Sequence, residues 1–212
     1  MNSEKGLVEI APGAYHLPAY LTSQEQLQLV LRCRELGTQQ TGFYQPTVRG
    51  GAKMRIEMLC LGQHWNPMTY SYEPNRSDYD GKAVPPLPAD LSTIAGRVAT
   101  AAGFLFEPDI CILNYYPPDG RLGLHQDKDE HPETLRLGIP IVSLSVGNTA
   151  QFMLGGIRRK DPTQTILLTS GDALVLAGPS RLRYHGVSRI LSGTGPKDLN
   201  LNGRFNLTFR RY

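Results

Sequence analysis

The chain lacks any apolar run close to the roughly 20 residues that a membrane-spanning helix needs, and its first residues lack the apolar core of a secretory signal. Cysteine is scarce: three residues, odd in number and widely spaced, exclude a disulfide framework and a zinc knuckle and favour reduced thiols in the cytoplasm. Neither sign of charge dominates, because a net charge of +3 permits an anionic partner without requiring one. The length of 212 residues suits one domain with a real core.

Two stretches carry the signals of amphipathic helices. Thr22-Ser23-Gln24-Glu25 is a capping box, and apolar residues then recur at helical spacing until Gly37, which can end the helix. Asp90 is the expected cap of a second helix that Gly103 closes. We interpret both as packing helices without a chemical role. Between them, residues 54–58 alternate like a strand.

From residue 109 onward, the pattern changes to short strands separated by glycine- and proline-rich turns. No helical crossover interrupts this series, so a parallel α/β sheet is not expected. The spacing predicts a mainly β fold with flanking helices, in the form of an antiparallel jelly roll or barrel. The predicted strands cover residues 110–116, 122–125, 139–146, 151–154, 165–169, 173–177, 183–190 and 204–210.

A candidate metal site begins with His125 and Asp127, which point to the same side of a strand because side chains alternate. His185 stands on a later predicted strand and offers a third ligand. Two histidines and one carboxylate on one face of a metal form the facial triad of non-haem Fe(II) oxygenases. A His-x-Asp pair also arises by chance, so its meaning depends on the remaining motifs.

The last predicted strand has an unusual polar face made by Arg204, Asn206, Thr208 and Arg210. This face is either solvated, as on many antiparallel sheets, or directed into the barrel, where anions must match the guanidinium groups. A dicarboxylate would satisfy both arginines through paired hydrogen bonds. The run Asn114-Tyr115-Tyr116 offers further donors for a carboxylate, or is simply a tyrosine-rich strand edge.

Aromatic and basic residues provide a possible surface for nucleic acid. The only tryptophan, Trp65, precedes Tyr70 and Tyr72 in loop-like sequence, and these rings either plug a hydrophobic gap or stack on a base. The basic turn Arg158-Arg159-Lys160 is either a phosphate contact or an ordinary solvated hairpin.

Taken together, the order and spacing of these motifs resemble the AlkB family of Fe(II)/2-oxoglutarate-dependent dioxygenases, and most closely its bacterial DNA-repair members. The similarity extends from about Phe43 to the C-terminus. The combination is specific, although no single part of it is. It rests on Asn114-x-Tyr116, His125-x-Asp127-Lys128-Asp129-Glu130, His185 and Arg204-x-Asn206-x-Thr208-x-Arg210, supported by Trp65, Tyr70-x-Tyr72, Gly171-Asp172 and Ser180-Arg181-Leu182.

The resemblance implies a single domain: a double-stranded β-helix (jelly roll) over about residues 109–212, preceded by helices and a nucleotide-recognition lid over about 1–108. It implies Fe(II) ligated by His125, Asp127 and His185, with O2 and the cosubstrate 2-oxoglutarate. We expect Arg204 at the distal carboxylate of 2-oxoglutarate and Arg210 near the metal-side carboxylate. The implied 2-oxoglutarate contacts are Asn114, Tyr115, Tyr116, Arg204, Asn206 and Arg210, and the implied substrate contacts are Trp65, Tyr70, Tyr72, Asp129 and Arg159.

The implied function is oxidative demethylation of 1-methyladenine and 3-methylcytosine in single- or double-stranded DNA, coupled to conversion of 2-oxoglutarate to succinate with release of formaldehyde. Three alternatives stay open: an RNA- or tRNA-modifying dioxygenase, a cupin-like small-molecule dioxygenase or hydrolase, and a non-catalytic nucleic-acid binder. The protein is expected to act as a monomer away from membranes.

Overall fold

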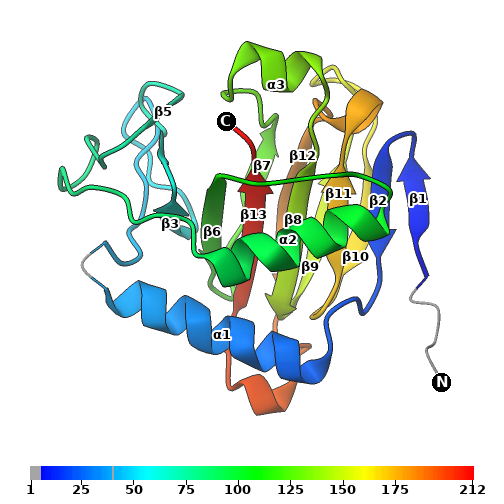
Figure 1. Ribbon diagram of the computed structural model, residues 1–212. Coiled ribbons are helices and arrows are strands. Elements are labelled where there is room, and N and C mark those ends of the chain that lie inside the picture. The colour runs from blue at the N-terminus through cyan, green and yellow to red at the C-terminus, as the bar shows by residue number, and fades with distance from the viewer. Residues whose placement is uncertain (1–5, 40) are drawn as a thin grey trace.

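The computed structural model describes residues 6–39 and 41–212. The prediction that the first residues lack a secretory signal falls partly on residues 1–5, which lie outside the described residues. Two antiparallel sheets dominate the fold (Figure 1). The larger sheet has the strand order β1 (Val8–Ala11), β2 (Ala14–Leu17), β11 (Ala173–Leu176), β8 (Ile141–Gly147), β13 (Arg204–Arg210), β6 (Ile110–Tyr116), β3 (Glu57–Leu61).

The smaller sheet faces the inner side of the larger one and completes a jelly roll. Its neighbouring strands are antiparallel. Strands β9 and β10 follow each other directly in the chain, whereas the other neighbours are separated by strands of the larger sheet. Every strand predicted from residue 109 onward is present, and the bounds of three of the eight agree to the residue, whereas the others differ by one or two. The order in the smaller sheet is β10 (Gln164–Leu168), β9 (Thr149–Leu154), β12 (His185–Leu191), β7 (Leu122–His125).

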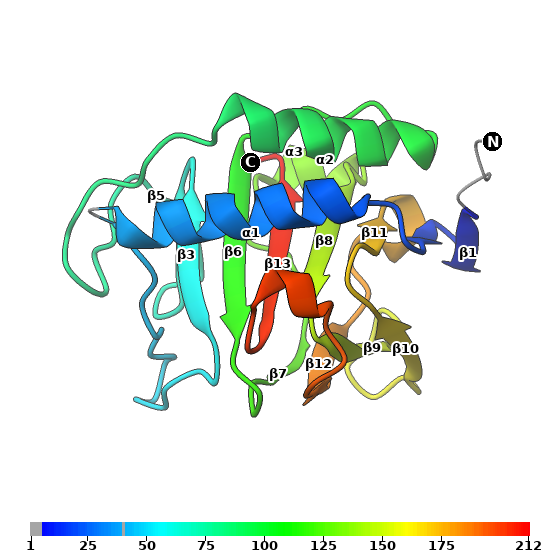
Figure 2. The ribbon, with the colours of Figure 1, turned by 90° about the horizontal axis from the view of Figure 1, so that it is seen from below.

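Two long helices, α1 (Ser23–Thr38) and α2 (Ala89–Ala101), lie across the outer face of the larger sheet (Figure 2). The predicted capping box of α1 is confirmed: the Thr22 hydroxyl accepts from the backbone N–H of Glu25 at 3.2 Å, and the Glu25 carboxylate accepts from the Thr22 N–H at 2.8 Å. These two bonds satisfy N–H groups that the first turn leaves without a helical partner.

Two details of the helix predictions are wrong. Gly37 does not end α1, which continues to Thr38. Asp90 does not cap α2; the cap position is Pro88, and Asp90 lies in the first turn. The fixed φ of Pro88 suits the extended backbone of the cap position, so the helix begins directly after it. Asp90 in the first turn is still favoured by the helix dipole.

Burial divides the apolar residues between two layers. One cluster joins Leu29 and Val30 of α1 and Val98 of α2 to the outer face of the larger sheet, including Leu207. A second cluster lies between the sheets and includes Phe152 of β9. Alternation along β13 therefore directs its apolar residues to the helices and its polar residues into the space between the sheets.

A separate hairpin of β4 (His64–Asn66) and β5 (Ser71–Glu73) stands beside the jelly roll (Figure 1). The strand predicted over 54–58 starts later, at Glu57, because the preceding residues form irregular loop contacts such as Met54 N–H to Pro46 O. A short helix α3 (Pro132–Arg136) and 3-10 turns η1 (Gly178–Ser180) and η2 (Lys197–Leu199) complete the described elements. None of the helices in the described ranges is long and apolar enough to traverse a bilayer.

Candidate active site

The predicted metal-binding residues come together where the smaller sheet opens. Strands β7 and β12 are antiparallel neighbours, and their register sets His125 directly opposite His185. The two imidazole ring centres lie 4.5 Å apart, and Asp127 follows two residues after the end of β7. One ligand atom from each of the three residues lies within 4.8 Å of the other two. This grouping could hold a metal ion.

Backbone carbonyls orient both imidazoles toward this point. The Nδ1 of His125 lies 2.9 Å from the carbonyl of Gly123, and the Nδ1 of His185 lies 3.0 Å from the carbonyl of Arg183. A proton on each Nδ1 leaves the Nε2 lone pairs free for a metal. These Nε2 atoms lie 3.7 and 3.6 Å from the two carboxylate oxygens of Asp127, a separation that suits an ion between them.

The charge environment keeps two of the ligands in the state that binds metal. Burial, and after it the neighbouring His185, lower the pKa of His125 to about 4 against the opposing effect of Asp127. Burial disfavours the charged form of Asp127, but the Arg210 guanidinium at 2.7 Å holds the pKa of this carboxyl well below its usual range. At neutral pH His125 is neutral and Asp127 is ionised, as metal coordination requires.

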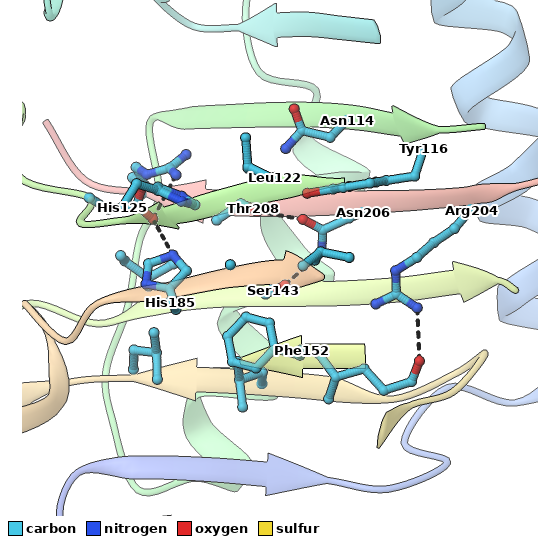
Figure 3. Close-up of a pocket in the computed structure, with 18 residues that line it drawn as sticks. Asn114, Tyr116, Leu122, His125, Ser143, Phe152, His185, Arg204, Asn206 and Thr208 are labelled. Carbon is cyan, nitrogen blue, oxygen red and sulfur yellow. Dashed lines mark hydrogen bonds and ion pairs between the residues drawn. The ribbon is translucent and has the colours of Figure 1, made fainter. Parts of the chain in front are cut away.

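A cavity between the sheets extends away from the histidines, and Arg204 closes its far end (Figure 3). Arg204 is only 1% exposed. It donates to the carbonyls of Asn148 and Leu168, at 3.2 and 3.0 Å, and to the hydroxyl of Ser145. Among the described residues no carboxylate pairs with it, its Nε is without a partner, and burial lowers its pKa to about 10.

The opposite end of the same cavity contains Arg210 beside Asp127. The Nη1 of Arg210 is also buried without a partner in the described part of the chain. Two guanidinium groups with free N–H donors therefore face one cavity: Arg210 already has a protein carboxylate, whereas Arg204 has none among the described residues and is costly to bury unless an anion matches it. A short dicarboxylate fits this requirement, so the residues present suit 2-oxoglutarate. The polar face of β13 is directed inward, and the solvated alternative is excluded.

The remaining 2-oxoglutarate predictions divide into two groups. Asn114, Tyr116 and Asn206 line the cavity as expected (Figure 3). The amide nitrogen of Asn206 already donates to the Ser143 hydroxyl and the Leu144 carbonyl, at 2.7 and 3.0 Å, so its orientation is fixed by the protein.

Tyr115 requires a correction. It does not line the cavity, because alternation along β6 turns it to the opposite face of the sheet. There its ring packs on Phe205 with centroids 5.3 Å apart, and its hydroxyl donates to the Asn202 carbonyl. Tyr115 is therefore a packing residue of the outer core.

All five predicted substrate residues line a second, more aromatic cleft: Trp65, Tyr70, Tyr72, Asp129 and Arg159. The indole N–H of Trp65 donates to the Asp129 carboxylate at 2.8 Å, and the Trp65 and Tyr70 rings lie 6.2 Å apart. Arg159 donates to the carbonyl of Leu124 at 3.0 Å, which holds the basic turn against the metal strand. The structure thus brings together residues that are far apart in the sequence.

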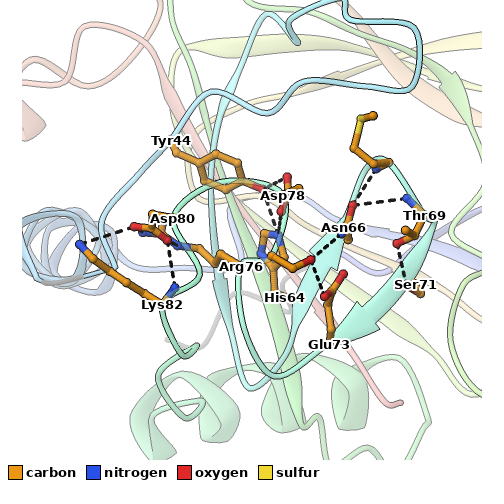
Figure 4. A network of polar contacts seen from close by, with 12 residues as sticks. Tyr44, His64, Asn66, Thr69, Ser71, Glu73, Arg76, Asp78, Asp80 and Lys82 are labelled. Carbon is orange, nitrogen blue, oxygen red and sulfur yellow. Dashed lines mark hydrogen bonds and ion pairs between the residues drawn. The ribbon is translucent and has the colours of Figure 1, made fainter.

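A buried polar network supports the hairpin that carries Trp65 (Figure 4). His64, whose role the sequence leaves open, is fully buried and lies 2.5 Å from the carboxylate of Asp78. Arg76 is buried as well; it pairs with Asp80 and donates to the carbonyls of residues 41 and 42. Sequence reasoning missed this network because its members look like ordinary loop residues until the chain folds.

The buried histidine predicts a pH dependence of stability. Burial lowers the pKa of His64 in the folded protein, although Asp78 opposes this, while the unfolded chain protonates near the ordinary value of about 6.5. The unfolded state therefore binds more protons as the pH falls through this value, and the free energy of unfolding falls with it. We expect urea midpoints to drop between about pH 7 and pH 5. A His64→Gln variant should show a smaller drop; equal drops would contradict the assignment.

Two further buried charges near the metal site had no role assigned from sequence. Glu130 and Arg181 are 5% and 1% exposed and form an ion pair at 3.0 Å. Both stand inside motifs that carry the family resemblance, which was the available signal. Their mutual contact, across 51 positions of the chain, is visible only in the structure.

A jelly roll that holds two histidines and one carboxylate beside an arginine-lined cavity defines the class of non-haem iron oxygenases that use a 2-oxo acid. The comparison with protein families agrees: residues 13–210 match the model of the 2OG-Fe(II) oxygenase superfamily. The chain belongs to this superfamily and, by its similarity to bacterial AlkB over nearly its whole length, to the AlkB family. Its cofactors are accordingly Fe(II), 2-oxoglutarate and O2.

Three relatives illustrate the similarity. AlkB of Escherichia coli (strain K12) is 38% identical over 95% of this chain and 91% of its own length. The Arabidopsis thaliana protein named DNA N(6)-methyladenine demethylase ALKBH1C is 40% identical over 96% of this chain. The solved structure of OsALKBH1 superposes with a TM-score of 0.92 at 38% identity and covers 98% of this chain and 100% of that one. The chain spans about half the length of the Arabidopsis relatives that it matches.

Proposed function

We propose that this protein oxidatively removes N-linked methyl groups from bases in nucleic acid, with DNA as the leading substrate. One observation carries the proposal: the arginine-lined cavity and the aromatic cleft meet at the metal-binding residues. His125, Asp127 and Arg210 line both spaces. A cosubstrate on one side and a base on the other would therefore reach the same metal.

The residues of the chain prepare this meeting point. Arg204 and Arg210 would bind the two carboxylates of 2-oxoglutarate and set its position along the cavity. Trp65 and Tyr70 offer aromatic faces, on which a base stacks with about 1–3 kcal/mol. When bound, Fe(II) and 2-oxoglutarate supply, with O2, the oxidising power for hydroxylating an N-methyl group, which leaves as formaldehyde while succinate and CO2 form.

Asp129 favours a cationic base in the aromatic cleft. Its carboxylate lines the cleft and is held by Trp65 at 2.8 Å. 1-Methyladenine and 3-methylcytosine carry a positive charge, which a carboxylate and aromatic faces attract. They also pair poorly, so flipping them out of a duplex costs less. These two bases are the leading substrates.

Methylation at N6 of adenine is the second candidate substrate. Relatives at 40% identity are named DNA N(6)-methyladenine demethylases. This base is neutral, so it would gain less from Asp129 than a cationic base. RNA carrying the same methylated bases is the corresponding alternative polymer.

The assay compares these substrates directly. The protein is incubated with Fe(II), ascorbate, 2-oxoglutarate and single-stranded oligonucleotides containing 1-methyladenine, 3-methylcytosine or N6-methyladenine, in DNA and in RNA. We expect the oligonucleotide to lose the mass of one CH2 while succinate and formaldehyde form. This reaction should be fastest for the cationic bases in DNA. Absence of any loss from every methylated base would refute the proposed function. An Asp129→Asn variant should lose its preference for the cationic bases over N6-methyladenine.

We further propose one domain, with the jelly roll as the catalytic core and the segment before residue 109 as helices and lid. The three cysteines are free and buried, which suits a reducing, cytoplasmic compartment. We infer that the protein acts as a monomer, because the metal-binding group and both cavities are complete without a residue from a second copy.

A further inference from the structure

Glu130 lies at the centre of a buried ionic cluster behind the metal ligands. Its Oε2 is 3.0 Å from Nη2 of Arg181, and its Oε1 is 3.1 Å from Nε of Arg210. Its side chain is only 1% exposed. A buried carboxylate of this kind is stable only because two cations match it.

Both arginines of the cluster also hold Asp127. Nη2 of Arg210 lies 2.7 Å from a carboxylate oxygen of Asp127, and Nη1 of Arg181 donates to its backbone carbonyl at 2.5 Å. Arg181 is further anchored by the carbonyl of Ile139 at 2.9 Å. Two carboxylates and two guanidinium groups thus balance in charge, and Glu130 is the carboxylate that contacts both arginines. The position of Asp127 depends on Glu130 through them.

The cluster also reaches the aromatic cleft. The hydroxyl of Tyr72, on β5, donates to Oε1 of Glu130 at 3.4 Å. Tyr72 pairs directly with Trp65 of β4 in the hairpin register. Glu130 is therefore in contact with the wall of the substrate cleft on one side and with the partner of Asp127 on the other.

We propose that Glu130 is a positioning residue that couples the aromatic cleft to the metal site, through Tyr72 on one side and Arg210 on the other. The coupling rests on the proposed function, since it needs a base in the cleft. With a dication on Asp127, Arg210 would keep a smaller share of that carboxylate and would depend more on Glu130, while its free Nη1 donor would remain for 2-oxoglutarate. This fixes the carboxylate that Tyr72 contacts and orders that wall of the cleft.

Such coupling must be reciprocal: a filled metal site tightens nucleotide binding by the same factor by which the nucleotide tightens the metal site. The factor is measurable without turnover. Zn(II) replaces Fe(II), and the probe is a single-stranded DNA oligonucleotide with one 1-methyladenine. Its affinity is measured with and without Zn(II) and 2-oxoglutarate, and the ratio is the coupling factor. Emission of Trp65, the only tryptophan, reports the cleft wall without any oligonucleotide.

For the unaltered protein we expect a coupling factor of about tenfold and an emission change of Trp65 on addition of Zn(II) and 2-oxoglutarate. Tyr72→Phe and Glu130→Gln should reduce the factor to below about threefold and diminish the emission change. Tyr70→Phe is the matched control: it removes the same hydroxyl from the other tyrosine of the cleft, which does not contact Glu130, and should keep the coupling factor.

The outcomes separate the two proposals. A coupling factor and emission change in Tyr72→Phe equal to those of the unaltered protein would overturn the role of Glu130. If Glu130→Gln does not fold, Tyr72→Phe decides alone, because it retains every charge of the cluster. If no methylated oligonucleotide binds, the proposed function fails, whereas an emission change that is lost in Tyr72→Phe but kept in Tyr70→Phe still supports the coupling.

Discussion

Replacing Asp127 by alanine is expected to lower turnover by more than about 100-fold, because loss of a residue that merely orients a metal ligand already costs 10- to 100-fold. Asp127 presents both oxygens to the two histidines at 3.7 and 3.6 Å, and no other carboxylate belongs to the metal-binding group within the described residues. Zn(II) affinity, measured by calorimetric titration, should fall together with turnover. The fold should persist, since Arg210 keeps its ion pair with Glu130.

Asp129→Asn is the control for this experiment. Asp129 lies in the same loop, two residues away, but contacts Trp65 and lines the substrate cleft. Its replacement should leave the Zn(II) affinity unchanged while altering the choice of substrate. Turnover retained in Asp127→Ala, with unchanged Zn(II) affinity, would refute the ligand assignment.

The second large effect is expected at Arg204. Substitution by methionine, which is similar in length and uncharged, should raise the KM for 2-oxoglutarate by about 100-fold or more, since removing one partner of a buried charge pair costs 2–5 kcal/mol. Arg204 is the only described guanidinium that lines the cavity without a protein carboxylate beside it. Arg204→Lys keeps the charge but loses the paired geometry, so an intermediate KM is expected.

Initial rates at varied 2-oxoglutarate concentration measure this effect, with succinate as the product. Arg189→Met provides the matched control, because Arg189 is an exposed arginine of β12 outside both cavities. The KM of the Arg189→Met variant for 2-oxoglutarate should equal that of the unaltered protein. An unchanged KM in Arg204→Met would remove the argument that this buried cation exists for a dicarboxylate. It would also favour a cupin-like small-molecule dioxygenase or hydrolase, which needs no arginine at this position.

Alternation explains why much of the site could be predicted. A strand turns successive side chains to opposite faces, so Arg204 and Arg210 were expected together. The same rule was applied to His125 and Asp127, which do come together, although β7 ends at His125 and Asp127 lies two residues beyond it. The same rule argued for Asn114 with Tyr116 and against Tyr115. Naming Tyr115 as a 2-oxoglutarate contact followed the run of adjacent residues and neglected the alternation, and the structure corrects it.

Local rules were less reliable where the chain leaves regular structure. The start of α2 was misplaced because Asp90 is a good cap by residue type, whereas the fixed backbone of Pro88 decides the boundary. The loop around Met54 looked like a strand because its side chains alternate, yet the Met54 N–H donates to Pro46 O and Arg55 forms only an isolated bridge, with Arg121. The alternation of side chains does not show which groups form hydrogen bonds with the backbone.

The sequence by itself determined the two long helices, the eight strands after residue 109, the chemistry of the metal ligands and the presence of a polar strand face with two guanidinium groups. These depend on residue type and on spacing along one strand, which are local quantities. Only the tertiary structure decided that Arg204 is a buried cation without a protein anion, while Arg210 is matched by Asp127 and Glu130. The physical reason is that desolvation and ion pairing depend on which distant segments surround a charge. The same holds for the metal-binding residues: His125 and Asp127 were expected as neighbours, but His185 and Arg181 reach them only through the fold.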